Sequence, residues 1–279
     1  MPTPPLVTYD AYVDADAVLA YALATNDPNE LCSTGAKAAA LVTAPHVVGA
    51  FIQTNGKAFP EGTVTGGRGA VHGMHDVHFY APLELGSTVR VEGRRYAVKQ
   101  TPAGVSVTSD LRVLNQDGKL LLRHFWTGMI IGGQTSQEVG ENPPEHSFPE
   151  EARENPIGSF TFDVTRDQGF RYGGASGDRN GHAIDDSIAQ SEGFPRKIVQ
   201  GLCTFAMCSG AVVKLIGDGN PDNLSRIAGR FSSPMFPGST LTVDVFDAGR
   251  NEAGGRKIAF EATSNGVIVV KHGRAEFVA

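Results

Sequence analysis

The stretch Gly201–Ile216, GLCTFAMCSGAVVKLI, decides the fold. Apart from Thr204, Ser209 and Lys214, every residue in it is apolar or small, so a helix built from it has no polar face. A helix that is hydrophobic all round must be covered on every side by other structure. We therefore expect a sheet that curls around this buried helix.

The chain contains the same unit twice. An ungapped slide of 151 residues gives six identities between positions 13–29 and 164–180, and a slide of 152 gives six more between 79–91 and 231–243. Two independent matches at nearly one offset indicate an internal duplication. Residues 45–53, PHVVGAFIQ, are the weaker first-half counterpart of the buried helix.

Residues 134–158 separate the two copies. They contain four Pro, six Glu and a single Arg with no apolar periodicity, which is typical of a linker. The chain thus divides into 1–133, 134–158 and 159–279, and each half places a helical and loop region before a meander of strands. The predicted fold class is α+β, with strands at 105–114, 120–131, 241–246, 256–263 and 267–277.

The composition favours small-molecule chemistry. With 279 residues and 41% hydrophobic content the chain can build a sizeable core. Its net charge of -6 argues against a nucleic-acid partner and against a basic membrane-binding surface. No apolar run approaches the roughly 20 residues of a membrane span, and residues 1–9 lack the features of a secretory signal. We expect a cytoplasmic protein.

Cysteine and histidine spacing argues against a metal site. The three cysteines are an odd number without C-x-x-C spacing, which indicates reduced thiols. His72, His75 and His78 suggest a ligand cluster, but on a regular strand His72 and His78 face one way and His75 the other. We therefore predict structural histidines and neither a metal nor a cofactor.

The densest polar cluster is 176–182, SGDRNGH. In this loop Asp178 and His182 offer a carboxylate and an imidazole, the base and the acid needed to add water to an activated double bond or to remove it. The alternative is a tight turn in which Asp and Asn bond their own backbone. The matching first-half stretch keeps Asp27 and Asn29 but loses the Gly-His pair, so we expect a single working site in the second half.

Two residues of the buried helix are further candidates. Gly201 begins the helix, where free backbone N–H groups and the positive end of the helix dipole suit a developing negative oxygen. The alternative is that Gly201 only starts the helix. Ser209, two turns further on, either faces the same pocket or fills the core.

The second half resembles a known family. Residues 172–180, YGGASGDRN, the pair Gly193-Phe194 and residues 198–204, IVQGLCT, follow the pattern of the MaoC-like dehydratases, or (R)-specific enoyl-CoA hydratases, which are built on the hot-dog fold. The first half is similar to the degenerate copy of two-domain members. The resemblance implies a double hot-dog, in which two curved antiparallel sheets each wrap a helix and residues 159–279 carry the site.

The resemblance also implies a chemistry. In such proteins the Asp of this motif and a His five residues later activate one water for addition across a trans-2-enoyl thioester. Asp178 matches that carboxylate and Gly201 the oxyanion donor, while Ser176, Asn180 and Ser209 are expected to bind substrate or to complete the oxyanion hole. The implied partner is an acyl-CoA or acyl-carrier-protein thioester, with no cofactor.

The chain departs from the family pattern at three places. The family His position is occupied by Ala183, with His182 one residue early; Gly181 replaces a Pro; and Gln200 replaces the His before the helix glycine. A flexible Gly181 would let His182 turn towards Asp178. The alternative is that Asp178 acts alone on a more easily eliminated substrate.

The predicted function is reversible hydration and dehydration of an enoyl or 3-hydroxyacyl thioester, with Asp178 and His182 catalytic. Two alternatives remain. One is a non-catalytic protein that binds acyl thioesters, and the other is a hot-dog thioesterase in which Asp178 activates a hydrolytic water. We predict that two chains form a homodimer, although the sequence does not fix the oligomeric state.

Overall fold

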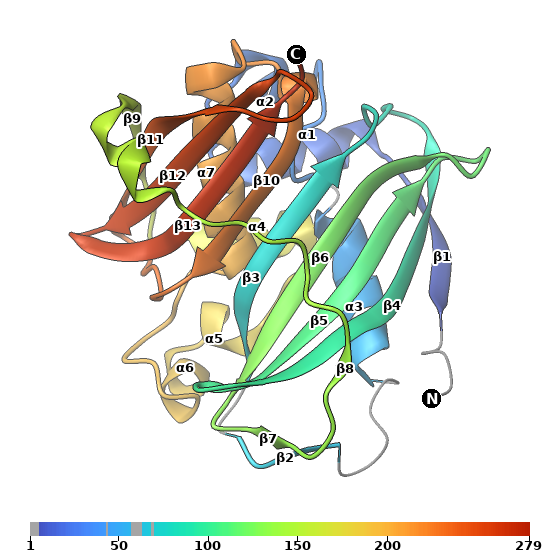
Figure 1. Cartoon of the computed structure of the whole chain (residues 1–279), viewed down its shortest axis with the longest axis vertical. Helices are drawn as coiled ribbons and strands as arrows, with labels where there is room; N and C mark the ends of the chain where they lie inside the picture. Colours follow the sequence, from blue (N-terminus) through green and yellow to red (C-terminus); the bar gives the residue numbers. More distant parts are fainter. Residues whose placement is uncertain (1–5, 43, 57–62, 68–69) are drawn as a thin grey trace.

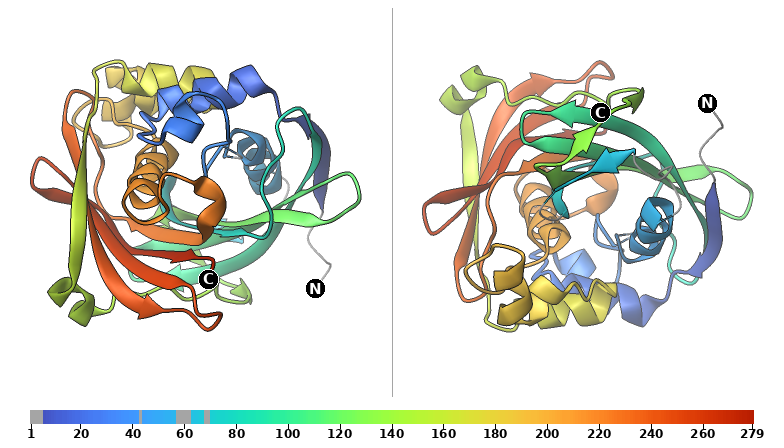
Figure 2. Two further views of the ribbon diagram at one scale, coloured as in Figure 1. Left: turned by 90° about the horizontal axis from the view of Figure 1, so that it is seen from above. Right: turned by 90° about the horizontal axis from the view of Figure 1, so that it is seen from below.

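The computed structural model describes residues 6–42, 44–56, 63–67 and 70–279. One antiparallel sheet of eleven strands runs through this part of the chain, and its main path has the order β1-β4-β5-β6-β3-β10-β13-β12-β11-β9 (Figure 1). The sheet is curved, and helices occupy its concave side (Figure 2). The predicted α+β class is confirmed.

The elements of each half follow one another in the same sequence. The first half consists of β1 (Val7–Tyr12), α1 (Ala15–Ala24), α2 (Glu30–Ser33), α3 (Ala44–Gly56), β3 (Ala70–Phe79), β4 (Thr88–Thr101), β5 (Gly104–Leu114) and β6 (Leu120–Ile131). The second half consists of β9 (Pro156–Asp163), α4 (Gln168–Ser176), α5 (Gly181–Ile184), α6 (Asp186–Ser191), α7 (Gly201–Ile216), η2 (Pro221–Asn223), β10 (Leu224–Phe231), β11 (Thr240–Arg250), β12 (Arg256–Ser264) and β13 (Val267–Phe277).

The strand order is mirrored about the centre of the sheet. From one edge it runs β1, β4, β5, β6, β3, and from the other edge the equivalent strands run β9, β11, β12, β13, β10. The halves meet where β3 pairs with β10, with Asp76 opposite Ala228. The Arg226 side chain donates two hydrogen bonds, of 3.0 and 2.7 Å, to the buried carboxylate of Asp76. This ion pair therefore joins the two halves across the central strand pair.

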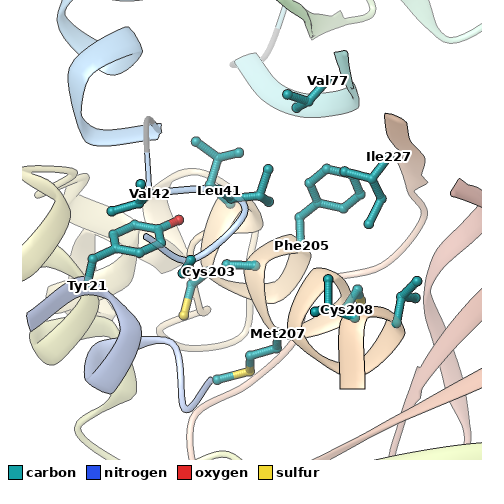
Figure 3. Packing of buried hydrophobic residues seen from close by; sticks show 14 of the residues in the cluster. Tyr21, Leu41, Val42, Val77, Cys203, Phe205, Met207, Cys208 and Ile227 are labelled. Atoms are coloured by element: carbon teal, nitrogen blue, oxygen red, sulfur yellow. The ribbon is translucent and has the colours of Figure 1, made fainter. Parts of the chain in front are cut away.

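Helix α7 is buried as predicted, and all of its residues from 202 to 213 are buried. Figure 2 shows α7 inside the curve of the sheet beside α3, with α1 and α4 covering the side that the sheet leaves open. In Figure 3, Phe205 points from α7 towards Ile227 and Val77 of the sheet, and Cys203 lies near Tyr21 of α1. Within the described ranges, no helix is long and apolar enough to cross a membrane.

Strands β1 and β9 are among the strands that the sequence analysis did not predict. They open the two halves, and each forms an edge of the sheet. An edge strand pairs on one side only, and most residues of both strands are at least partly exposed, so their hydrophobic signal is weak. Strand β9 begins at Pro156, a position that an edge strand tolerates. The linker therefore ends before position 158.

The remainder of the predicted linker also carries short elements. Strand β7 (Gln134–Thr135) pairs with β2 (Val64–Thr65), and β8 (Val139–Gly140) pairs with β4. The 3-10 helix η1 (Glu150–Glu154) precedes β9. This segment is thus a strap attached to the sheet at several points.

Candidate active site

A cavity of about 520 Å³ is lined by residues of both halves. The first half supplies a mostly apolar wall from α3, β3, β5 and β6. The second half supplies the loop before and through α5, the start of α7 and residues 231–235. Apolar walls with a few convergent polar groups are typical of small-molecule sites. Four of the six predicted site residues line this cavity: Asp178, Asn180, His182 and Gly201.

The Asp178 loop is fixed by its own backbone contacts. Helix α4 ends at Gly177, whose φ of 74° is a left-handed conformation that glycine adopts without strain. The Ser176 hydroxyl donates to the Tyr172 carbonyl at 2.7 Å and accepts from the Asp178 N–H at 3.1 Å. Ser176 is buried and is absent from the described cavity lining, so it holds the loop in shape.

Gln200 ties this loop to the start of α7. Its side-chain amide donates to the carbonyl oxygens of Gly169, at 3.0 Å, and Asp178, at 2.9 Å. The side chain is 2% exposed. Gln200 therefore connects the two parts of the site, a role that the sequence did not indicate.

The Asp178 carboxylate is suited to accept a proton. It is half-buried at the cavity, and burial raises the pKa of this carboxyl group, while the Asn180 N–H and the nearby His182 act in the opposite direction. The Asn180 N–H donates to Asp178 Oδ1 at 3.3 Å. A raised pKa makes a carboxylate a stronger base.

His182 lines the cavity from α5. Its Nδ1 lies 2.8 Å from Glu192 Oε2, and its ring meets Phe194 edge-on at 5.8 Å between centroids. Among the described residues no direct hydrogen bond joins the His182 and Asp178 side chains. The next residue, Ala183, is 1% exposed and does not belong to the described lining. Position 182, rather than 183, thus faces the cavity.

Gly181 has a different role from the one expected. It does not adopt a positive φ. A Cβ at this position would lie 2.8 Å from Ile188 Cγ2, so a larger residue would require the Ile188 side chain of α6 to move. The glycine therefore leaves room for the Ile188 side chain.

Gly201 is the first residue of α7 and borders the cavity. In the described part of the chain neither the Gly201 N–H nor the Leu202 N–H has an acceptor, as is usual in a first helical turn. These groups and the helix dipole can bind a negative oxygen. Ser209 is 1% exposed, and it is absent from the described lining. It therefore packs in the core, the second of the two alternatives.

The prediction for the histidines of β3 was wrong about which of them share a face. The pairing of β3 with β6 shifts register between His72 and Met74, which is a β-bulge at Gly73. The bulge places His72 and His75 together, with His72 Nε2 3.2 Å from His75 Nδ1. His78 instead lies 3.3 Å from Asp76. An isolated glycine in a strand is the signal that could have revealed the bulge.

His72 is the site residue that the sequence missed, because it lines the cavity beside Gly201. His75, which contacts His72 through Nδ1, contacts His124 through its other ring nitrogen: His75 Nε2 lies 3.0 Å from His124 Nδ1. The three imidazoles therefore form a chain. In the described part of the chain no group of three or more His, Cys, Asp or Glu side chains is arranged to hold a metal ion.

Comparison with known proteins identifies the family. Residues 148–271 match the family model described as the MaoC like domain. The 3-hydroxyacyl-thioester dehydratase Y of Mycobacterium tuberculosis is 31% identical over 218 residues, which cover 75% of this chain and 73% of that protein. The chain belongs to the MaoC-like dehydratase family. The resemblance inferred from the motifs is thereby confirmed.

A further sequence relative and a solved structure are also similar to this chain, and the structure is similar over nearly its whole length. The peroxisomal multifunctional enzyme type 2 of Drosophila melanogaster is 28% identical over 183 residues, which cover 64% of this chain and 30% of the fly protein. The crystal structure of a MaoC-like dehydratase from Phytophthora capsici superposes with a TM-score of 0.85 at 23% identity and covers 99% of this chain and 95% of that one. The double hot-dog fold is thus confirmed.

Proposed function

We propose that this protein catalyses the reversible addition of water to a 2-enoyl thioester, which gives a 3-hydroxyacyl thioester. The observation that carries the proposal is that Asp178 and the first turn of α7 line one cavity. A general base and an oxyanion-binding site are the two groups that such a reaction needs. The relative named as a 3-hydroxyacyl-thioester dehydratase supports the same reaction class.

The proposed mechanism begins with a water bound next to Asp178. The carboxylate accepts a proton from this water while the water oxygen bonds to the β-carbon. The electron pair of the double bond moves towards the thioester, and the Gly201 N–H stabilises the charge on the carbonyl oxygen. His182 donates a proton to the α-carbon, and the proton held by Asp178 then passes through solvent to His182, so both groups return to their starting state and one water is added in total. Dehydration follows the same steps in reverse.

His182 is the proposed acid partner in place of the family's His, and Ala183 is the substituted position. Two facts support this assignment. His182 lines the cavity while Ala183 is buried, and the Glu192 carboxylate orients the His182 ring through Nδ1. A carboxylate at Nδ1 fixes the orientation of an imidazole and leaves Nε2 for proton transfer.

The acyl part of the substrate is proposed to lie against the first half. The cavity wall there is formed by apolar side chains of α3, β5 and β6, including Phe51, Val107, Trp126, Ile130 and Ile131. Coenzyme A or a carrier protein would remain outside the cavity. A cytoplasmic location and a homodimer stay predictions, which cell fractionation and light scattering of the purified protein would check.

The test uses purified protein and crotonyl-CoA. Loss of the enoyl absorbance and release of free thiol are followed in parallel. We expect absorbance loss without thiol release, and a decrease of about 10²- to 10⁴-fold in rate for Asp178→Asn and for His182→Ala. Asp10→Asn is the control, because Asp10 is exposed and lies 3.4 Å from Arg90 on the sheet edge.

Each other outcome contradicts the proposal in a defined way. Thiol release without absorbance loss would identify a thioesterase. Binding of crotonyl-CoA with neither change would identify a non-catalytic acyl-thioester-binding protein. Full activity of His182→Ala would remove this residue from the mechanism while leaving Asp178 in it.

A further inference from the structure

We infer that His72, which the first half contributes, binds the thioester carbonyl of the substrate together with Gly201. This inference rests on the proposed function, because it assigns a second donor to the same oxyanion site. It is carried by the position of the His72 ring, by the contacts that fix it, and by the difference between the two copies of the repeat.

The first step is position. A Cβ on Gly201 would lie 3.4 Å from His72 Cβ and 3.5 Å from His72 Nδ1. The imidazole therefore covers the α-carbon of the first residue of α7, with its Nδ1 edge towards the helix start. Both residues line the cavity. In the inferred complex, a carbonyl oxygen bound by the N–H groups of this turn lies next to the His72 ring.

The second step is the rigidity of the ring. Trp126 stacks on His72 with 4.6 Å between centroids and 15° between planes, and Phe231 covers it at 4.5 Å. Trp126 in turn stacks on Phe51 at 4.1 Å. The Nε2 edge of His72 is occupied by His75, at 3.2 Å. Nδ1 is the edge nearer to the start of α7, and a donor held by these ring contacts needs no reorganisation when charge develops.

The third step is protonation. Burial lowers the pKa of His72 to about 3 and that of His124 to about 3, and burial together with these two neighbours lowers the pKa of His75 as well. All three rings are neutral at physiological pH, and each carries one N–H. When every ring is protonated at Nδ1, His124 donates to His75, His75 donates to His72, and His72 Nδ1–H is directed to the ligand.

A neutral imidazole suits this role. It donates a hydrogen bond to a carbonyl without transferring a full proton to the enolate. A backbone hydrogen bond with Met74 acts against burial and raises the pKa of His72, as a bond that the ring donates would do. We expect a bound thioester carbonyl to compete with the Met74 backbone for a ring N–H of His72.

The duplication provides an independent argument. Position 224, which lies 152 residues after His72, is Leu224, and position 227, which lies 152 residues after His75, is Ile227. Both leucine and isoleucine are buried. The first copy therefore carries the histidines and the second copy carries the Asp178 loop. The two sets of polar residues meet at one cavity, which both halves must complete.

The experiment compares His72→Phe with His72→Asn. Phenylalanine keeps the stacking between Trp126 and Phe231 and removes the donor, whereas asparagine places an N–H donor near the position of Nδ1. The probe is butyryl-CoA, a saturated thioester that cannot be hydrated. Its carbonyl stretching frequency in the bound state is measured by difference infrared spectroscopy, and binding is followed by the fluorescence of Trp126, the single tryptophan of the chain.

We expect binding to lower the carbonyl stretching frequency in the unmodified protein, and we expect at least half of this shift to be lost in His72→Phe and largely restored in His72→Asn. With crotonyl-CoA, kcat of His72→Phe should fall about 10²- to 10³-fold with KM changed less than threefold. Circular dichroism and thermal unfolding verify that both variants are folded.

An unchanged carbonyl shift in folded His72→Phe would overturn the inference even if hydration is fast. A His72-dependent shift in a protein that does not hydrate crotonyl-CoA would support carbonyl binding and refute the proposed reaction. Butyryl-CoA that fails to bind the unmodified protein would refute both. The three results are thus distinguishable.

Discussion

The Gln200 side-chain amide lies 2.9 Å from the Asp178 carbonyl oxygen, to which it donates a hydrogen bond across the entrance to α7. The same amide nitrogen bonds the Gly169 carbonyl of α4 at 3.0 Å. The residue that precedes the proposed oxyanion site therefore also sets the position of the proposed base.

The first prediction concerns this connection. Gln200→Met keeps the length of the side chain and removes both hydrogen bonds that the Gln200 amide donates, each worth about 0.5–1.5 kcal/mol. We expect the free energy of unfolding to fall by about 1–3 kcal/mol and kcat to fall more than KM rises. Chemical denaturation and steady-state kinetics measure the two effects.

The control for Gln200 is Gln190→Met. Gln190 is exposed, and its side chain donates to the Pro195 carbonyl at 3.3 Å. This variant should keep both stability and kcat. Equal losses in the two variants would show that the Gln200 contacts are not specific to the site.

The second prediction concerns Asp178 and pH. Burial raises the pKa of this carboxyl group in the folded protein. A raised pKa stabilises the fold below the pKa of the unfolded chain, and this contribution is lost as pH rises through the folded pKa. The charged Asp178 therefore costs stability at pH 7. Asp178→Asn should raise the melting temperature at pH 7, with a smaller difference at pH 4, as calorimetry would measure.

The activity should show the opposite dependence, because the base works as a carboxylate. We expect kcat/KM to rise with pH through a pKa above the usual range for Asp. A profile that is flat across acidic pH, or a melting temperature that falls in Asp178→Asn at pH 7, would contradict the assignment.

The third prediction concerns Glu192, whose carboxylate holds His182 at 2.8 Å. Glu192 is exposed, so its removal should change the melting temperature little. We expect Glu192→Ala to lower kcat about tenfold, because the orientation of the general acid is lost. The exposed Glu252→Ala, on the loop between β11 and β12, is the matched control. A kcat equal to that of the control would mean that His182 does not depend on this carboxylate.

The fourth prediction concerns the ion pair at the centre of the sheet. Burial alone would raise the pKa of Asp76, but hydrogen bonds and charges from His78 and Arg226 outweigh it and lower the pKa. A lowered pKa stabilises the fold above the pKa of the unfolded chain, and this stability is lost as pH falls through the folded pKa. Asp76→Asn removes the buried carboxylate that accepts two hydrogen bonds from Arg226 and leaves that guanidinium with the more distant Glu276 carboxylate, at 3.5 Å. We expect a loss of about 1.5–3 kcal/mol in unfolding free energy.

Urea denaturation at pH 7 measures this loss. Replacing both partners, as in Asp76→Leu with Arg226→Met, should recover part of the stability, since a buried apolar pair is often no less stable than a buried ion pair. If the single variant were as stable as the unmodified protein, the pair would not hold the halves together.

Much of the fold follows from the sequence because its strongest signals are physical ones. The uniform apolarity of α7 predicts its burial, and the repeat predicts two similar halves. Strands such as β5 and β13 are long and rich in β-branched residues. Strands β1 and β9 were not predicted, because an edge strand buries few side chains and because β9 begins with a proline, which suggests a loop.

Site residues that belong to a short sequence motif could be predicted, whereas a site residue beside an irregularity of the backbone could not. Asp178, His182 and Gly201 were located by short motifs, and the cavity contains all three. Ser209 was not separable from a core residue by sequence alone. His72 was missed because regular alternation places it opposite His75, and one extra residue at Gly73 reverses that relationship.

The mirrored strand order has a consequence for how such a protein changes over time. In an assembly of two identical chains, a single codon encodes both copies of a position, and two equivalent pockets result. Here the equivalent positions of the two halves are encoded by separate codons, so β3 and β10 accept mutations independently. The two halves of the described chain therefore contribute different side chains to the cavity that they share, and calorimetric titration with a thioester should give a stoichiometry close to one.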